Sequence, residues 1–148
     1  QLHINHGQHV ENGQYAYLVY AGKEKPKKAF KDLPLKVLEN STDIQAVSWG
    51  DHYIGAAFYN PKEVLKVDGA EISVSAPCAL LLEKNEDKWH LTVTDAEMNK
   101  NLRSIQVRTT LDISNDQSEK DGKWNVIEVP MFQGKLCGKP ATVELIMK

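Results

Sequence analysis

Hydrophobic and polar residues alternate with a period of two along most of the chain, which predicts β-strands rather than helices. The clearest example is the pair Asp43 to Trp49 and His52 to Tyr59, which Gly50-Asp51 joins in a sequence suited to a tight hairpin turn. The second strand carries apolar side chains on both faces, so we expect it to be covered on both sides. A short strand, Leu35 to Leu38, precedes this pair.

Beyond about Val64 the predicted strands have one apolar and one polar face. Strands of this kind build an antiparallel sandwich whose outer faces are solvated. The polar run from Ser114 to Gly122 is expected to be an exposed loop. We therefore predict an all-β chain of antiparallel β-sandwich type, with a domain boundary that separates residues 1–62 from residues 63–148. The one-sided strands are expected at Ile72–Val74, Lys88–Thr94, Ile105–Ile113, Trp124–Val129 and Ala141–Met147.

An early stretch, Tyr15 to Tyr20, also has apolar side chains on both faces. Such a strand is expected to lie between two layers. Because strand-like residues stand at the very beginning of the chain, we expect a fragment of a longer protein. Helix signals are few: Pro26 to Leu33 is expected to form about two turns, and Asn60 to Glu63 a single turn.

Composition and charge are ordinary for a globular protein and argue against two classes of partner. Of the 148 residues, 41% are hydrophobic and 26% are charged. A net charge of −2 gives no electrostatic case for binding nucleic acid or an anionic membrane surface. No apolar run approaches the roughly 20 residues that cross a bilayer. We therefore predict neither nucleic acid nor a membrane as a partner.

Two cysteines, Cys78 and Cys137, are too few for a disulfide framework. Cys78 precedes the apolar run Ala79-Leu80-Leu81-Leu82, so a buried free thiol is the favoured interpretation. Cys137, next to Gly138, is expected in a turn. A bridge between the two is the less favoured alternative, and the pair does not decide the redox compartment.

Three histidines, His3, His6 and His9, recur at every third position, and imidazole is a good zinc ligand. In a strand, however, residues three apart point to opposite faces, and no carboxylate or cysteine completes the set locally. We favour polar turn residues and predict no metal site.

A cluster of five lysines between Lys23 and Lys31 forms a local basic patch in an otherwise acidic chain. Its members Lys27, Lys28 and Lys31 are candidate contacts for the sulfate or carboxylate groups of an anionic polymer. The favoured alternative is a solvated helix face, which such charge runs more often form.

The three tryptophans are candidate platforms for stacking on sugar rings. Trp89 and Trp124 fall in phase with apolar neighbours and are expected in the core. Trp49, beside the predicted Gly50-Asp51 turn, is the one expected to be exposed and is the candidate carbohydrate contact. The sequence contains no nucleophile elbow, phosphate-binding loop, Cys-x-x-Cys pair or HExxH motif, so no catalytic residue and no cofactor are assigned.

Three stretches resemble polysaccharide lyase family 8, the enzymes that act on chondroitin and hyaluronan. INHGQHVENGQYAYLVYAG is similar to a His-Gly, then Tyr-x-Tyr, passage near the end of the family's central β-domain. LKVLENSTDIQAVSWGDHYIGAAFYN resembles the segment that follows it. ISVSAPCALLLEKNEDKWHLTVTDAEMN resembles the start of the family's carboxy-terminal β-sandwich, where a strand and a turn lead to a Val-x-Asp step. The Pro77-Cys78 step leans toward the chondroitin sulfate ABC lyases, whereas Ala96 stands where the family often has proline.

The resemblance implies a modular enzyme, in which an upstream α/α-toroid domain carries the catalytic His, Tyr and Arg and the central β-domain adds a Glu. The implied reaction is β-elimination: a base removes the C5 proton of a uronic acid, and the 4-linked sugar leaves. None of those catalytic positions maps onto this sequence. The resemblance therefore assigns no catalytic residue to the chain and implies no cofactor, and it leaves open whether the parent enzyme binds calcium.

On this resemblance, residues 1–62 are the last strands of the central supersandwich domain, and residues 63–148 are the terminal β-sandwich of a secreted or periplasmic lyase. The expected partners are an anionic polysaccharide, chondroitin sulfate or hyaluronan, and the toroid domain of the same chain. The fragment alone is expected to be inactive. The alternatives are a free-standing carbohydrate-binding or adhesion module and a structural module that binds nothing.

Overall fold

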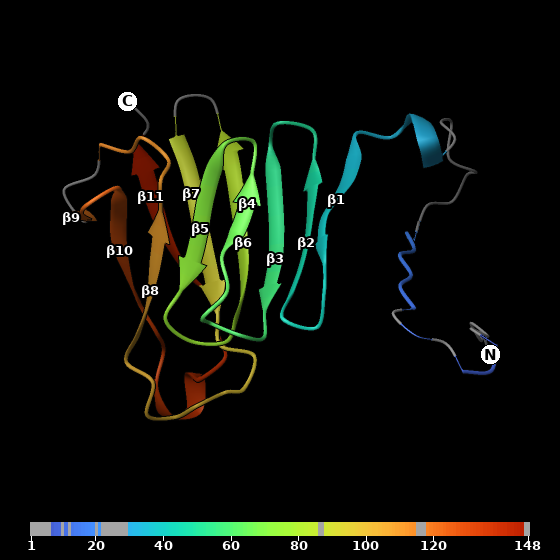
Figure 1. Cartoon of the computed structure of the whole chain (residues 1–148). Coiled ribbons are helices and arrows are strands. Elements are labelled where there is room, and N and C mark those ends of the chain that lie inside the picture. Colours follow the sequence, from blue (N-terminus) through green and yellow to red (C-terminus); the bar gives the residue numbers. More distant parts are fainter. Residues whose placement is uncertain are drawn as a thin grey trace. The chain divides into compact units, whose positions relative to one another are not determined.

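The structure is a computed structural model that describes residues 7–9, 11, 13–19, 21, 30–85, 88–114 and 118–146. The chain divides into two compact units, Gln1–Leu33 and Pro34–Lys148. Among its described residues, the first unit contains the 3-10 helix η1 (Phe30–Asp32). The described residues of the second unit contain the strands and the 3-10 helix η2 (Gly134–Leu136), as Figure 1 shows.

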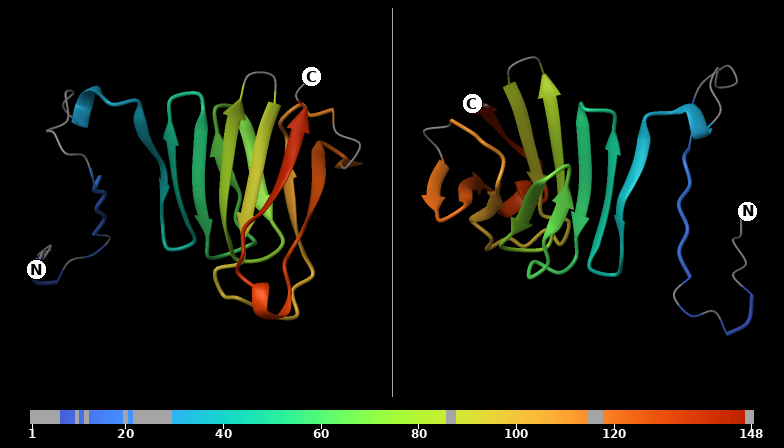
Figure 2. Two further views of the ribbon diagram at one scale, coloured as in Figure 1. Left: turned by 180° about the vertical axis from the view of Figure 1, so that it is seen from behind. Right: turned by 45° about the horizontal axis from the view of Figure 1, so that its top comes forward.

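Antiparallel strands build the second unit. They are β1 (Leu35–Asn40), β2 (Ile44–Trp49), β3 (Tyr53–Phe58), β4 (Leu65–Val67), β5 (Ala70–Val74), β6 (Cys78–Asn85), β7 (Lys88–Thr94), β8 (Ser104–Thr109), β9 (Ser118–Asp121), β10 (Trp124–Pro130) and β11 (Ala141–Ile146). A six-stranded sheet has the order β1-β2-β3-β6-β7-β11, and a five-stranded sheet has the order β4-β5-β8-β10-β9. The two sheets lie face to face as the layers of a sandwich (Figure 2).

Period-two alternation places every second side chain between the two sheets. In β2, Ile44, Ala46 and Ser48 are buried, and the residues between them are exposed. The same pattern in both sheets produces one hydrophobic core, to which Phe58 contributes from the larger sheet and Ile127 from the smaller one. Each large apolar side chain buried there contributes about 1.5–3 kcal/mol relative to its exposed state. The sandwich is therefore stabilised mainly by the contact between its sheets.

The predicted all-β antiparallel sandwich is confirmed, and the residues that the structure describes include no α-helix. β2 and β3 form the predicted hairpin. It turns at Gly50, whose φ of +55° lies in the left-handed region that glycine adopts without steric cost. Trp89 packs against the core, and Cys78 is buried, both as expected.

Two strand predictions are wrong, because a strand exists only where a neighbour pairs with it. Residues 13–19 belong to no strand, and Tyr15, Tyr17 and Val19 are exposed; Tyr20 lies outside the described residues. The predicted strand that reaches Ile113 ends at Thr109 as β8, and Ile113 forms an isolated bridge.

The predicted loop Ser114–Gly122 is also wrong in part, because β9 lies within it and pairs with β10. β9 is the edge strand of the five-stranded sheet. Its Ser-Glu-Lys-Asp sequence has no apolar face, so the ladder to β10, and not any hydrophobic pattern, makes it a strand.

Trp124 does not lie in the core, contrary to the prediction. In β10 it is Asn125, Ile127 and Val129 that are buried, so Trp124 lies on the outer face of its sheet. The cause is the strict two-residue period of a strand: once Ile127 faces inward, a residue three positions earlier must face outward.

β3 is covered on one face, whereas the sequence predicts cover on both. Phe58 is 1% exposed, but Tyr53 and Tyr59 on the opposite face are 41% and 56% exposed. The smaller sheet supplies a layer on one side of β3, and the described residues of the unit Pro34–Lys148 form no further sheet for the other side.

The helix predictions have mixed outcomes. Within Pro26 to Leu33, the described part forms the 3-10 turn η1, and residues 26–29 lie outside the described residues. Asn60 to Glu63 forms the predicted single turn, in which the N–H of Glu63 donates to the carbonyl oxygen of Asn60 at 3.2 Å. The side chain of Asn60 also accepts the N–H of Lys62 at 3.1 Å.

The predicted boundary between residues 62 and 63 stays a prediction as an assignment to two domains of a longer lyase. In the structure, β3 pairs directly with β6, so strands from both sides of that boundary share one sheet. The chain instead divides between Leu33 and Pro34.

Candidate functional surfaces

The predicted carbohydrate contacts fall in different parts of the chain. Lys27 and Lys28 lie outside the described residues, and Lys31 is exposed in η1. Trp49 ends β2, is 38% exposed and lies opposite Tyr53 in the β2–β3 register. Exposure of Lys31 and Trp49 agrees with the prediction, and a carbohydrate role for these residues stays a prediction.

The outer side of β1, β2, β3 and β6 forms an exposed apolar surface, which we call the apolar sheet face. The register aligns Val37, Val47, Gly55 and Leu81 in one row across the four strands. Gly55 adds no side chain, and the small residues Ala57 and Ala79 lie nearby in register, so the surface has few projections. The members of the apolar sheet face are Val37, Val47, Trp49, Tyr53, Tyr59 and Leu81, all between 38% and 56% exposed.

The same side of β7 and β11 is mostly polar, although the exposed Ile146 lies at the end of β11. The hydroxyl groups of Thr92 and Thr142 are hydrogen-bonded at 2.9 Å. The Lys88 ammonium donates to the Glu144 carboxylate at 2.7 Å, which lowers the pKa of Glu144, and His90 lies 3.7 Å from the same carboxylate. The outer side of β7 and β11 is therefore readily solvated, whereas the outer side of β1, β2, β3 and β6 exposes mainly apolar side chains.

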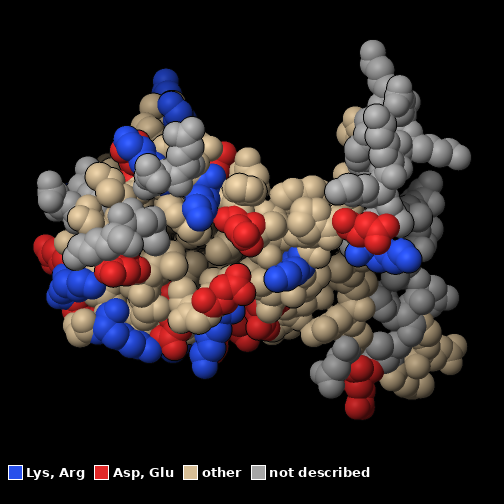
Figure 3. All heavy atoms as spheres, turned by 90° about the horizontal axis from the view of Figure 1, so that it is seen from above, with Lys and Arg blue, Asp and Glu red and all other residues tan. Residues whose placement is uncertain are grey.

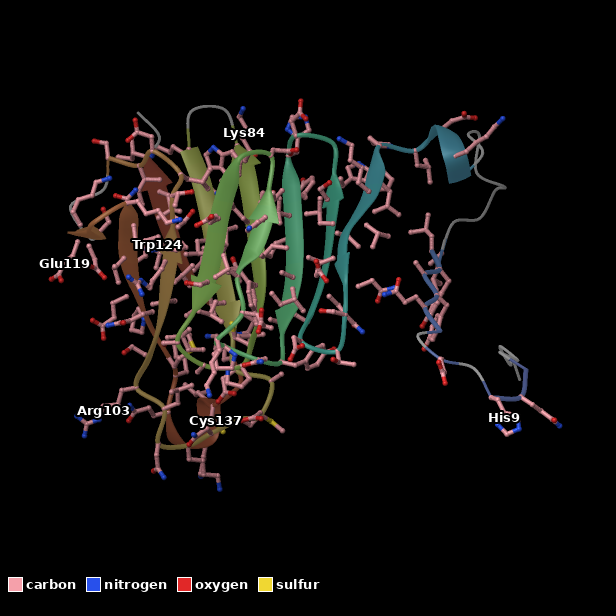
Figure 4. All side chains as sticks on the ribbon, viewed as in Figure 1. His9, Lys84, Arg103, Glu119, Trp124 and Cys137 are labelled. Carbon is pink, nitrogen blue, oxygen red and sulfur yellow. The ribbon has the colours of Figure 1, made fainter. Side chains whose placement is uncertain are left out.

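Trp124, labelled in Figure 4, lies between two cations on the outer face of the smaller sheet. The Arg108 guanidinium is 5.3 Å and the Lys123 ammonium 5.0 Å from its ring centroid. Both cations also form salt bridges, Arg108 with Asp121 and Lys123 with Glu71. Because Arg108 and Lys123 both contact the indole ring, Trp124 does not present an open platform for a sugar ring.

Two loops meet at one end of the sandwich, residues 95–103 after β7 and residues 131–140 before β11. The N–H of Met131 donates to the carbonyl oxygen of Arg103 at 2.8 Å. The first loop is organised by Asp95, which is 4% exposed and whose carboxylate accepts the N–H groups of Glu97 at 3.0 Å and Asn99 at 2.6 Å. Figure 4 labels Arg103 and Cys137 at this end.

This end carries four exposed cations, Lys100, Arg103, Lys135 and Lys139, which we call the basic loop end. None of the salt bridges formed among the described residues involves them. The Lys139 ammonium lies 4.8 Å from the ring centroid of Phe132. Glu97 is the exposed acid of the same two loops, so cations outnumber exposed acids there. At the opposite end, seen from above in Figure 3, acidic and basic side chains are interspersed.

The remaining candidate chemistry is limited. Among the described residues, no group of three His, Cys, Asp or Glu side chains could hold a metal. His3 and His6 lie outside the described residues, and His9 is exposed. Cys78 and Cys137 are both free, so the less favoured bridge does not form. No helix in the described part of the chain is long and apolar enough to cross a membrane.

Comparison with known proteins identifies the class. Residues 36–102 match the model of the polysaccharide lyase family 8 C-terminal beta-sandwich domain. Chondroitinase-AC of Pedobacter heparinus is 32% identical over 147 residues, which cover 98% of this chain and 19% of that protein. The polysaccharide lyase 8 family protein HylA of Enterococcus faecalis is 28% identical, over 78% of this chain and 11% of its own length.

Solved structures show the same fold. A chondroitinase AC lyase studied in oligosaccharide complexes superposes with a TM-score of 0.60 and 29% identity, over 82% of this chain and 17% of its own. The Streptomyces coelicolor A3 chondroitin AC lyase, solved with chondroitin sulphate, has a TM-score of 0.57 and 17% identity, over 78% of this chain and 15% of its own.

These matches show that the chain carries the C-terminal β-sandwich domain of polysaccharide lyase family 8, as the sequence resemblance predicts. The chain spans about a fifth of the length of the Pedobacter relative. The matched residues 36–102 include β2, β3 and all of β1 except Leu35, and these strands pair within the sandwich. The relatives named above are AC lyases or a family 8 protein, and the leaning toward an ABC lyase stays a prediction.

Proposed function

We propose that the chain is the non-catalytic C-terminal part of a secreted or periplasmic lyase that cleaves chondroitin-type polysaccharide by β-elimination. One observation carries the proposal: 98% of the chain aligns with chondroitinase-AC, yet it accounts for 19% of that enzyme. No catalytic motif stands in the sequence, so the reacting groups belong to the larger remainder, where the resemblance locates a toroid domain.

The basic loop end supports a direct contact with the polysaccharide. A glycosaminoglycan carries closely spaced carboxylate and sulfate groups, and lysine ammonium groups act on them as point charges. Because the four cations of the basic loop end form no salt bridge with described residues, a polyanion need not displace an acidic partner there. Contacts of this exposed kind are screened by salt, so the proposed binding weakens as ionic strength rises.

An activity assay tests the first part of the proposal. The purified chain, incubated with chondroitin sulfate, is expected to produce no increase in absorbance from unsaturated uronate. A longer family 8 chain that includes this domain is expected to produce that increase. Turnover by the purified chain alone would overturn the non-catalytic assignment.

Retention on immobilised chondroitin sulfate tests the second part. The double variant Lys135→Gln with Lys139→Gln is expected to elute at a lower salt concentration than the unchanged chain. The matched control is Lys62→Gln with Lys66→Gln, which removes the same charge from exposed positions elsewhere. Equal shifts for both pairs would show that net charge alone is responsible and would remove the basic loop end from the proposal.

The candidates from the sequence are tested in the same way. Replacement of Lys27, Lys28 and Lys31 by alanine is expected to reduce retention if that patch contacts the polymer, and unchanged retention would end that prediction. Binding by this chain without any longer chain would favour a carbohydrate-binding role for the domain itself.

A further inference from the structure

We propose that the basic loop end is a preorganised site for a sulfated stretch of glycosaminoglycan, and that Phe132 positions the Lys139 ammonium group within it. The inference rests on the polysaccharide contact proposed above and deepens it, because such a site distinguishes a sulfated polymer from an unsulfated one such as hyaluronan. It also gives a role to an aromatic side chain that the sandwich core does not use, since Phe132 is 37% exposed.

Contacts within the fold bring Arg103, Phe132 and Lys139 to the same end of the sandwich. The N–H of Met131 donates to the carbonyl oxygen of Arg103 at 2.8 Å, and Phe132 is the next residue. The Lys139 ammonium in turn lies 4.8 Å from the centroid of the Phe132 ring. Cations from two separate loops are therefore gathered around one short stretch of backbone.

The Phe132 ring holds Lys139 without neutralising its charge. An aromatic ring attracts a cation through its quadrupole and carries no net charge. None of the salt bridges in the described part of the chain involves Lys139. At Trp124 the arrangement differs, because Arg108 and Lys123 contact the ring and each also pairs with a carboxylate. Of these three ring-bound cations, Lys139 is the one whose charge is left for an anionic ligand.

Hydrogen-bonded turns fix the backbone that carries Lys135 and Lys139. The N–H of Leu136 donates to the carbonyl oxygen of Gln133 at 3.2 Å, and the N–H of Lys139 donates to that of Leu136 at 3.0 Å. A site whose backbone is already ordered loses less conformational entropy when a ligand binds. Contact with the Phe132 ring also restricts the rotamers of the Lys139 side chain, which lowers that cost further.

The number of available cations favours a sulfated ligand. The basic loop end contains Lys100, Arg103, Lys135 and Lys139, and Glu97 is the exposed acid of the same two loops. A disaccharide of chondroitin sulfate carries a carboxylate and a sulfate, whereas a hyaluronan disaccharide carries the carboxylate alone. Over the same length, a sulfated chain therefore forms more ion pairs with cations that are confined to one end of the sandwich. Since each exposed ion pair contributes little by itself, the number of pairs decides the affinity.

Calorimetric titration of this chain with hexasaccharides of chondroitin 4-sulfate, chemically desulfated chondroitin and hyaluronan tests the preference for sulfate. At low ionic strength, the sulfated probe is expected to bind about two- to thirtyfold more tightly than the others, the range for two further exposed ion pairs. The preference is expected to vanish in about 1 M salt, where the screening length is about 3 Å. Equal affinities for the three hexasaccharides at low ionic strength would overturn the inference.

Variants at Phe132 test its positioning role. Phe132→Leu keeps an apolar side chain but removes the ring, and is expected to weaken binding of the sulfated probe about two- to fivefold. Phe132→Tyr keeps the ring and is expected to bind like the unchanged chain. Trp124→Leu is the matched control, because it removes a ring whose cations are already paired with carboxylates, and it is expected to leave the affinity unchanged.

A double-mutant cycle separates positioning from direct contact with the sugar. In the Lys139→Gln background, Phe132→Leu is expected to cause no further loss of affinity, because the ring then has no cation to hold. A further loss of comparable size would show that the ring itself contacts the sugar and would overturn the positioning role. If Lys62→Gln with Lys66→Gln weakened binding as much as Lys135→Gln with Lys139→Gln, net charge alone would account for binding and the site would fail.

The lyase assay distinguishes failure of this inference from failure of the proposed function. If a longer family 8 chain that includes this domain shows no lyase activity while this chain still prefers the sulfated probe, the site stands and the proposed lyase function fails. If the longer chain is active and this chain does not discriminate between the probes, the lyase function stands and the site fails.

Discussion

The hydroxyl group of Thr94 donates a hydrogen bond of 2.7 Å to the carbonyl oxygen of Gly138. This bond joins the end of β7 to the loop before β11. Gly138 has a φ of +80°, and a Cβ atom added there would lie 2.8 Å from the Cγ atom of Met98. The two loops of the basic loop end are therefore held against each other at a point where a Cβ atom would have to displace the Met98 side chain.

Gly138→Ala is expected to destabilise the chain more than Gly69→Ala does. Both glycines have φ near +80°, so both variants bear the cost of about 1 kcal/mol for a left-handed alanine. A Cβ at Gly69 meets nothing within 4 Å, whereas one at Gly138 displaces Met98. Urea unfolding measures the difference, and equal losses of stability would contradict the close approach of the two loops.

Asp95→Ala is expected to reduce the free energy of unfolding by about 2–4 kcal/mol, because the N–H groups of Glu97 and Asn99 lose their acceptor. Asp95→Asn keeps one acceptor oxygen and is expected to lose less. Glu97→Ala is the control, since that side chain is exposed and is expected to have almost no effect. If the alanine and asparagine variants were equally stable, the carboxylate would not organise the loop.

Cys78 is expected to resist thiol reagents in the folded chain. Burial, with the charge of Asp95 as a second cause, raises the pKa of this thiol from 9.0 to about 12, so the reactive thiolate is scarce at pH 8. A colorimetric thiol assay is expected to find one accessible thiol, Cys137, and a second only after denaturation. The variant Cys137→Ser should then show no reaction before unfolding, and a fast reaction in that variant would contradict the burial.

The same raised pKa predicts a loss of stability at high pH. The unfolded chain releases the Cys78 proton near pH 9, whereas the folded chain retains it until about pH 12. The contribution of this thiol is therefore complete below pH 9 and falls by about 1.4 kcal/mol for each pH unit above that. The variant Cys78→Ala, compared between pH 8 and pH 10.5, is expected to lose less stability over that interval than the unchanged chain.

Leu80→Ala and Leu81→Ala are expected to differ widely although the residues are neighbours. Leu80 is 4% exposed and lies between the sheets, so its truncation is expected to cost about 2–5 kcal/mol. Leu81 is 40% exposed on the apolar sheet face, and its truncation is expected to cost about 0.5 kcal/mol or less in this chain. Similar losses for the two variants, measured by chemical denaturation, would mean that both faces of β6 are covered.

The sequence correctly predicts those strands whose hydrophobic alternation agrees with the way they pair in the sheets. The β2–β3 hairpin and β7 are correct because alternation, turn residues and ladder partners coincide there. β9 could not be predicted, because its four residues have no apolar face and exist as a strand only beside β10. Trp124 was assigned to the wrong side because an aromatic residue beside apolar neighbours fits either face until the register is known.

The candidate surfaces likewise include features that the sequence predicts and features that it does not. The exposure of Trp49 could be predicted from its place beside a hairpin turn. The basic loop end could not, because its cations come from two loops that are about 30 residues apart in sequence and meet through the contacts of Thr94 and Met131. The sequence predicted cover on both sides of the strand that is β3; within the unit Pro34–Lys148, the described residues cover one side.

By itself, the sequence determined the class of fold, most of the strands and the resemblance to family 8, because period two, turn residues and local motifs are properties of neighbouring residues. The tertiary structure decided which strands pair, which side of each strand faces the core, and which distant side chains share a surface. Those outcomes depend on register and on non-local contacts, and a shift of one residue exchanges the two faces of a strand. Local sequence patterns therefore predict the strands of this chain, whereas its surfaces depend on how those strands pair and pack.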